Sequence, residues 1–85
     1  MVDVVIYTRP GCGFCTRAKQ LLSSKGKAFS EFNIWSSDEI NTEMRKRTGG
    51  AATVPQIFID DDHIGGCDDL FTLDRAGHLD ALLNQ

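Results

Sequence analysis

Cys12 and Cys15 lie in the stretch GCGFC and are separated by two residues. Their type and spacing indicate that they could carry out chemistry. Such a pair is a redox couple, a pair of metal ligands or two small buried residues, and the motif alone leaves these alternatives open. A structural zinc ion needs four ligands. Cys67, His63 and His78 are the other candidates, but the chain has no second C-x-x-C motif and no histidine pair at ligand spacing. The sequence therefore argues against a zinc site, and we interpret the histidines as surface residues.

The segments around the cysteines predict where their sulfur atoms lie. Residues 2–8 (VDVVIYT) form a β-branched, largely apolar run that is typical of a strand buried on both faces. From Gly13 to Lys25 the apolar residues recur at helical spacing, and Gly26 is a natural stop. Cys12 thus begins a helix just after the carboxyl end of a strand, which is the edge of an α/β sheet where ligands bind.

The two thiols are expected to differ in character. Free N–H groups and the positive end of the helix dipole favour a thiolate at Cys12, and Arg9 adds a positive charge nearby. Cys15 lies one helical turn further on, so its sulfur can reach that of Cys12. Among Phe14 and Ala18 it should be more buried and less acidic. An exposed, activated thiol beside a shielded one is the arrangement that disulfide exchange requires.

The remainder of the chain predicts a mixed sheet with helices on its faces. We expect a strand at 28–34, a helix from Ser37 to the Gly49–Gly50 pair, strands at 55–60 and 63–66 joined by a turn at 60–62, and short helices at 67–77 and 78–85. The order is βαβα followed by ββα. A strand–helix–strand start implies a parallel pair with a right-handed crossover, and the hairpin then extends the sheet.

Length and composition favour one small soluble domain that spans residues 1–85. The chain has 85 residues, of which 41% are hydrophobic and 25% charged, ordinary values for a globular protein. The longest apolar run, VVIY, is too short to span a membrane, and no signal peptide is visible, so we expect a cytoplasmic protein without a membrane partner. Because the cytoplasm is reducing and three cysteines are an odd number, we expect no resting structural disulfide.

The net charge of −3 is distributed unevenly along the chain. Residues 1–50 carry eight Lys and Arg against five Asp and Glu, whereas residues 51–85 carry one against seven. We interpret this asymmetry as a solvated surface of mixed sign. The run Arg45, Lys46 and Arg47 is too short to argue for nucleic acid as a partner.

Three motifs together resemble a known family. TRPGCGFC, TVPQIFID and HIGGCDDL stand at the spacing of the glutaredoxins, and the chain resembles a bacterial dithiol glutaredoxin over nearly its whole length. The resemblance implies a thioredoxin-like α/β fold, in which a four-stranded mixed sheet is flanked by helices. It implies glutathione-dependent exchange with glutathionylated or disulfide-containing proteins, in which Cys12 attacks and either Cys15 or a second glutathione resolves the intermediate.

The resemblance also implies a glutathione site. The residues that it assigns to this site are Arg9, Phe14, Thr53, Val54, Pro55, Gly66, Cys67, Asp68 and Asp69. A cis bond between Val54 and Pro55 is expected, with the Val54 backbone pairing with glutathione as a strand would. The N–H groups of Cys67 and Asp68 suit the γ-glutamyl carboxylate. The carboxylate of Asp68 or Asp69 suits the ammonium group, and Arg9 stands where the family usually has lysine, opposite the glycine carboxylate.

Two departures from the dithiol pattern give an alternative. C-G-F-C replaces the usual C-P-Y-C, and it differs from the C-G-F-S of monothiol glutaredoxins by one residue. Monothiol members commonly bind a [2Fe–2S] cluster between two subunits. By this resemblance Cys12 would be a metal ligand, and the chain, otherwise expected to be a monomer, would be a dimer when it holds the cluster. TGGAATVP also lacks the arginine often found before T-V-P, so we expect Asn41 or one of Arg45, Lys46 and Arg47 to supply a second contact to the glycine end of glutathione. The motifs do not explain Trp35.

Overall fold

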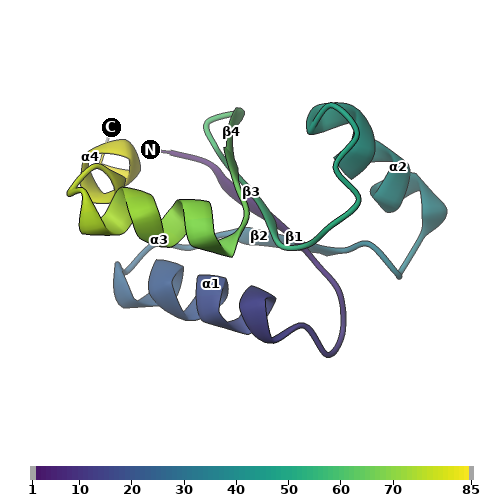
Figure 1. Cartoon of the computed structure of the whole chain (residues 1–85), viewed down its shortest axis with the longest axis horizontal. Coiled ribbons are helices and arrows are strands. Elements are labelled where there is room, and N and C mark those ends of the chain that lie inside the picture. Colours follow the sequence, from purple (N-terminus) through teal and green to yellow (C-terminus); the bar gives the residue numbers. More distant parts are fainter. Residues whose placement is uncertain (1, 85) are drawn as a thin grey trace.

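The computed structural model describes residues 2–84, and the chain folds into one sheet with helices on both faces (Figure 1). The elements are β1 (Val4–Thr8), α1 (Gly13–Ser24), β2 (Ser30–Asn33), α2 (Asp38–Arg47), β3 (Gln56–Ile59), β4 (Asp62–Gly65), α3 (Cys67–Arg75) and α4 (Leu79–Leu83). The four strands lie in the order β2-β1-β3-β4. Strand β1 is parallel to β2 and antiparallel to β3, and β3 is antiparallel to β4. This confirms the expected four-stranded mixed sheet of the thioredoxin-like fold.

The central strand β1 supplies both faces of the sheet with core residues. Successive side chains of a strand point to opposite faces, so Ile6 packs beneath α1, α3 and α4, whereas Tyr7 packs beneath α2. Strand β3 repeats this alternation with Ile57 on the first face and Phe58 on the second. Because β1 and β3 are covered on both sides, both strands are almost entirely buried, as the apolar run of residues 2–8 predicted.

The observed bounds differ from the predicted ones at the ends of elements. Strand β2 covers only Ser30–Asn33 of the predicted 28–34, because its ladder with β1 runs from the Val5–Ser30 pair to the Thr8–Asn33 pair. Helix α3 ends at Arg75 rather than at residue 77. The last predicted helix, 78–85, is observed as Leu79–Leu83, and its final residue Gln85 lies outside the described residues.

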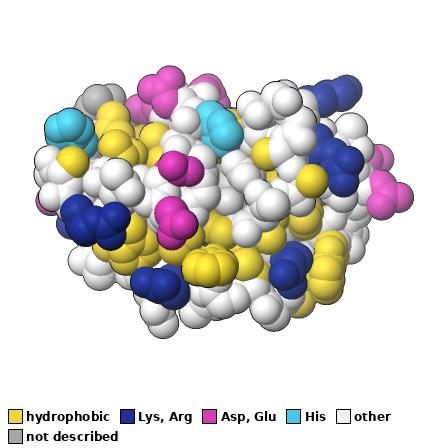
Figure 2. Space-filling view, viewed as in Figure 1, with side chains coloured by type: hydrophobic (Ala, Val, Ile, Leu, Met, Phe, Trp, Pro, Cys, Tyr) yellow, Lys and Arg dark blue, Asp and Glu magenta, His cyan; other side chains and the backbone are white. Residues whose placement is uncertain are grey.

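The surface reflects the charge asymmetry of the sequence. On the face shown in Figure 2, acidic side chains gather over the β3–β4 hairpin and the start of α3, and basic side chains lie along the lower edge and the right side. Within residues 2–84, no helix is long and apolar enough to cross a membrane.

Candidate active site

The sulfur of Cys12 caps the N-terminus of α1. Cys12 is the N-cap residue, with extended backbone angles, and its Sγ accepts a hydrogen bond of 3.2 Å from the backbone N–H of Cys15. An N–H donor and the positive end of the helix dipole therefore both point at this sulfur, as the position of the motif predicted. Negative charge that develops on Sγ during exchange is stabilised at this position.

Cys15 has the shielded character that the sequence predicted. Its exposed fraction is 2%. Burial, together with its hydrogen bond to Cys12, raises the pKa of the Cys15 thiol to about 12. Burial also raises the pKa of Cys67, and all three cysteines are free thiols.

Cys12 is less exposed than expected. We predicted an exposed thiol, but its exposed fraction is only 8%. The reason is a segment from the far side of the fold: the carbonyl oxygen of Val54 lies 3.9 Å from Cys12 Sγ and accepts a weak thiol hydrogen bond. The bond between Val54 and Pro55 is cis, as the family resemblance implied. The segment before β3 thus lies directly beside the start of α1.

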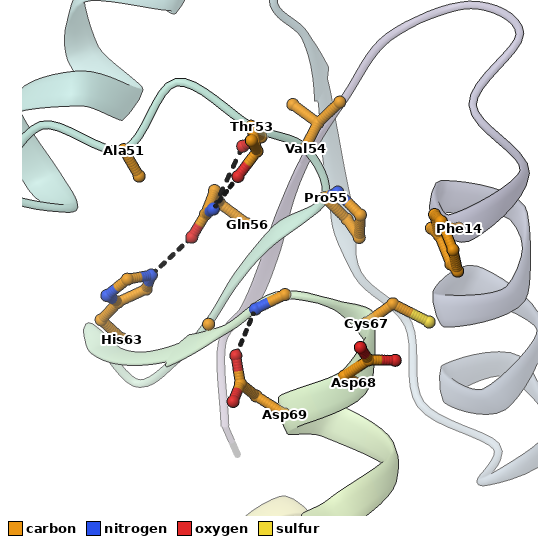
Figure 3. Close-up of a pocket in the computed structure, with 12 residues that line it drawn as sticks. Phe14, Ala51, Thr53, Val54, Pro55, Gln56, His63, Cys67, Asp68 and Asp69 are labelled. Carbon is orange, nitrogen blue, oxygen red and sulfur yellow. Dashed lines mark hydrogen bonds between the residues drawn. The ribbon is translucent and has the colours of Figure 1, made fainter.

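A cavity of about 370 Å³ opens on one side of this contact and collects eight of the eleven predicted site residues (Figure 3). Phe14 contributes from α1, the segment 53–55 from the loop before β3, and residues 66–69 from the start of α3. Cys12, Cys15 and Arg9 do not line it. The three predicted motifs therefore meet in space, although their segments are far apart in the sequence.

The start of α3 separates the roles that two adjacent aspartates can play. Asp69 Oδ2 accepts a hydrogen bond of 3.0 Å from the backbone N–H of Gly66, the N-cap residue, so this carboxylate is committed to the helix end (Figure 3). Gly65 has a φ of +114°, and a Cβ built there would lie 2.3 Å from Asp69 Oδ2. Only glycine fits this close approach. Asp68 and Asp69 are both exposed and both line the cavity, and the Asp68 carboxylate, which does not cap the helix, is the one that we expect a ligand cation to contact.

Sequence reasoning missed a set of linked hydrogen bonds between polar side chains in the cavity wall. The Gln56 side chain is buried, and its Nε2 donates to the Thr53 carbonyl oxygen at 3.1 Å and to Thr53 Oγ1 at 3.3 Å. Its Oε1 lies 2.7 Å from His63 Nε2 on β4. Figure 3 shows these hydrogen bonds from His63 through Gln56 to Thr53. A glutamine at the start of the otherwise apolar strand QIFI is the signal that indicates it.

Arg9 lines a second cavity, of about 360 Å³, on the other side of the same loop. This cavity shares Thr53 and Val54 with the first. Of the residues proposed to replace the missing arginine, Asn41 and Arg45 line it, and Lys46 and Arg47 do not. Arg47 instead lies 4.0 Å above the Phe58 ring. Its guanidinium also contacts Tyr7 and Asp61.

Both cysteines open onto a third hollow, of about 460 Å³, on the β2 side of the motif. Glu31 and Lys19 line it and form an ion pair of 3.0 Å. The hydrogen bond from Thr8 holds the pKa of the Glu31 carboxyl below its ordinary value. Across residues 2–84, no three His, Cys, Asp or Glu side chains are grouped so that they could hold a metal ion. A cluster at Cys12 therefore needs ligands from outside the described chain.

Comparison with known proteins gives consistent matches over most of the chain. The sequence model of the family described as Glutaredoxin matches residues 4–64. Glutaredoxin 3 of Escherichia coli strain K12 is 57% identical over 83 residues, which cover 98% of this chain and 99% of the relative.

Three solved structures share the fold. The glutaredoxin of Brucella melitensis is 54% identical, with a TM-score of 0.83 over 98% of this chain and 89% of that one. A buckwheat glutaredoxin–glutathione complex is 31% identical, with a TM-score of 0.87 over 98% of this chain and 77% of that one. A structure described under "Metal Binding of Glutaredoxins" is 53% identical, with a TM-score of 0.73 over 98% and 89%.

Proposed function

Because this chain belongs to the glutaredoxin family, we propose that it is a glutathione-dependent thiol–disulfide oxidoreductase that reduces protein–glutathione mixed disulfides and protein disulfides. The observation that carries this proposal is the position of Cys12. Its sulfur caps α1 and lies 3.9 Å from the Val54 carbonyl, where two cavities meet. A tripeptide with its cysteine at this point extends one end into each cavity.

The proposed docking of glutathione follows from the chemistry of the two cavities. The backbone of the central cysteine lies along Val54, as an added strand would. The γ-glutamyl end enters the cavity at the start of α3, where backbone N–H groups suit its carboxylate and Asp68 suits its ammonium. The glycine carboxylate enters the second cavity, where Arg9 and Arg45 carry positive charge.

Each proposed reaction is a series of exchanges in which a thiolate attacks a disulfide and another thiolate leaves. The Cys12 thiolate attacks the glutathione sulfur of a mixed disulfide, and the protein thiolate leaves and takes a proton from solvent. The thiolate of a second glutathione then attacks the glutathione sulfur held on Cys12, releases glutathione disulfide and restores the Cys12 thiolate. On a protein disulfide, the Cys12 thiolate attacks one protein sulfur, and the other protein sulfur leaves as a thiolate. The Cys15 thiolate then attacks the sulfur of Cys12, releases the second protein thiolate and leaves a Cys12–Cys15 disulfide. Two glutathione thiolates reduce this disulfide in turn, which releases glutathione disulfide and restores both cysteines. Because burial and the hydrogen bond to Cys12 raise the pKa of Cys15 to about 12, this second route requires the Cys15 proton to be removed before the attack.

The test compares Cys12→Ser with Cys15→Ser in an assay that couples turnover to glutathione disulfide. Serine at position 12 should abolish exchange, because a hydroxyl cannot replace the thiolate at the helix N-terminus. Serine at position 15 should keep, or raise, the reduction of a glutathione mixed disulfide and lose the reduction of protein disulfides. Retained activity in Cys12→Ser together with loss in Cys15→Ser would show that the two roles are reversed.

A second candidate function is a carrier of a [2Fe–2S] cluster. Open space around the first helical residue favours it: a Cβ built at Gly13, the residue after Cys12, meets no atom within 4 Å. Cys12 is the only ligand assigned in this chain, and two copies with two glutathione thiolates complete a four-thiolate set. The cluster would supply electron transfer or be the cargo itself. The protein would then be a dimer when loaded.

The carrier function is tested by anaerobic reconstitution with iron, sulfide and glutathione, followed by a visible spectrum and a measurement of mass in solution. Cluster absorption with a dimeric mass supports it, provided that both disappear in Cys12→Ser and when glutathione is omitted. A cluster that Cys15→Ser alone loses would make Cys15 a ligand and exclude the glutathione-ligated arrangement.

A further inference from the structure

Trp35 is a large apolar side chain that the fold leaves uncovered. It is the single tryptophan of the chain, and its exposed fraction is 64%. Tryptophan is highly buried on average in folded proteins, so this exposure is unusual. None of the three motifs of the family includes it. An exposed indole beside the active site therefore calls for a physical reason.

The backbone holds Trp35 in place on both sides. Before it, the N–H of Ile34 donates to the Thr8 carbonyl at 2.8 Å and continues the ladder of β1 and β2. Asn33 then closes a turn around the tryptophan: its Oδ1 accepts from the N–H of Trp35 at 2.8 Å, and its carbonyl accepts from Ser36 Oγ at 2.6 Å. The outward direction of the indole is thus set by an ordered turn.

The indole contacts the guanidinium of Arg9. The Arg9 Cζ atom lies 5.5 Å from the centroid of the Trp35 ring, within the range of a cation–π interaction. The same guanidinium donates a hydrogen bond of 3.2 Å to the adjacent Pro10 carbonyl. A free arginine side chain samples many rotamers, and holding one of them costs conformational entropy. The indole removes part of that cost before a ligand arrives.

Both residues line the second cavity, and the character of that cavity indicates its ligand. Its lining consists of Arg9, Ile34, Trp35, Asn41, Arg45, Ala52, Thr53 and Val54. Two guanidinium groups and no carboxylate make it a site for an anion. Arg45 Nε donates to Asn41 Oδ1 at 3.3 Å, so the second arginine is also held in position.

We propose that Trp35 is a positioning residue that holds the Arg9 guanidinium at the mouth of the second cavity, and that this pair makes the enzyme select substrates whose glutathione moiety has a free glycine carboxylate. The inference rests on the proposed function, because it assigns the glycine end of glutathione to this cavity. Trp35 acts through Arg9.

The test uses two mixed disulfides of cysteamine, one with glutathione and one with the glycine ethyl ester of glutathione, and glutathione as the common reductant. Trp35→Ala should raise KM for the carboxylate substrate roughly two- to fivefold, the size expected for a cation–π contact at an exposed site. It should leave kcat, and KM for the ester, unchanged. Trp35→Phe keeps a ring face and should recover most of the loss.

A double-substitution cycle separates action through Arg9 from a general structural effect. Arg9→Gln should raise KM for the carboxylate substrate, and adding Trp35→Ala should raise it no further. The matched control is Phe71→Leu, which removes the stacking of Arg17 at 5.3 Å on a ring that lines neither cavity. This variant should leave the preference for the free carboxylate unchanged.

Fluorescence gives a readout independent of turnover, because the chain has one tryptophan. In Cys12→Ser, which cannot react, added glutathione should shift the Trp35 emission, and the ethyl ester should shift it less. Additive effects of Arg9→Gln and Trp35→Ala, or equal losses on both substrates, would overturn the proposal. Wild-type turnover without any preference for the free carboxylate would also overturn it while leaving the proposed function intact. Absence of glutathione-dependent turnover would refute the proposed function, and this inference with it.

Discussion

The N-termini of α1 and α3 both face the Val54–Pro55 segment, but the two helices are capped in different ways. At α1 the cap acceptor is the sulfur of Cys12 itself, so the N–H group of Cys15 acts on the reacting atom. At α3 the N-cap is Gly66, and Asp69 reaches back from the first turn to its N–H. The first arrangement stabilises charge on the protein, whereas the second leaves a helix end open to charge on a ligand.

The largest expected effect concerns the thiols at α1. At pH 8, with iodoacetamide, the native protein should take one label per chain, on Cys12, because the pKa of Cys15 is raised to about 12 and that of Cys67 is also raised. A thiol with that pKa is only about one part in 10⁴ thiolate at pH 8. Mass spectrometry of digests locates the label, and the denatured protein should take three, one for each cysteine.

The raised pKa of Cys15 also predicts how the free energy of unfolding changes with pH. Cys15 keeps its proton in the folded state to higher pH than it does in the unfolded chain, so the unfolded state loses protons first above pH 9. The free energy of unfolding should therefore fall as pH rises from 9 to 12. A Cys15→Ser variant, which lacks this thiol, should show a smaller fall. In the labelling experiment, rapid reaction of Cys15 with iodoacetamide at pH 8 would contradict the expected difference in reactivity between Cys12 and Cys15.

The second effect concerns the geometry of the α3 cap. Gly65→Ala should lower the free energy of unfolding by roughly 2–4 kcal/mol, since it combines backbone strain with loss of the cap. The cause is the Cβ that would lie 2.3 Å from Asp69 Oδ2. Gly77→Ala is the matched control, because Gly77 also has a positive φ, +78°, but nothing lies within 4 Å of its added Cβ. Equal losses in the two variants would mean that the cap contributes nothing.

The third effect isolates the cap itself. Asp69→Ala should lower the free energy of unfolding by about 1 kcal/mol, the usual contribution of a capping side chain. Asp68→Ala, one residue earlier and exposed, should change it by less than about 0.5 kcal/mol. Urea titration followed by circular dichroism measures both. A larger loss in Asp68→Ala would reverse the assignment made from the Gly66 hydrogen bond.

The smallest expected effect concerns the ligand side of α3. Asp68→Asn should raise KM for a glutathione mixed disulfide roughly two- to fivefold, the size of an exposed ion pair, and leave stability unchanged. The increase should shrink at high ionic strength because the charges are screened. Initial rates at low and high salt measure it. An increase that is independent of salt would exclude Asp68 as the partner of the ligand ammonium.

The sequence was most informative where a pattern is local. The strand before Cys12, the helix after it and the shielding of Cys15 follow from periodicity and from a three-residue spacing, and the structure confirms them. The cis bond before Pro55 came from the resemblance to the family, and it is present.

What the sequence could not predict depends on tertiary packing. The cover over Cys12 comes from Val54, 42 residues further along the chain. The division of labour between Asp68 and Asp69 depends on which carboxylate reaches back to Gly66. Arg47 could not be separated from Arg45 by spacing alone, because its direction is set by the ring of Phe58, over which it lies.

The sulfur cap of α1 links the reduction potential of the protein to the stability of a helix end. A thiolate at Cys12 would be stabilised by the N–H of Cys15 and by the helix dipole, whereas a disulfide at Cys12 carries no charge on which they could act. Interactions that favour the reduced form over the oxidised form make a dithiol protein a stronger oxidant. We therefore expect substitutions in the first turn of α1 that never touch a substrate to shift the redox equilibrium of the protein. The reduction potential of this protein is thus expected to depend partly on backbone N–H groups at the start of α1.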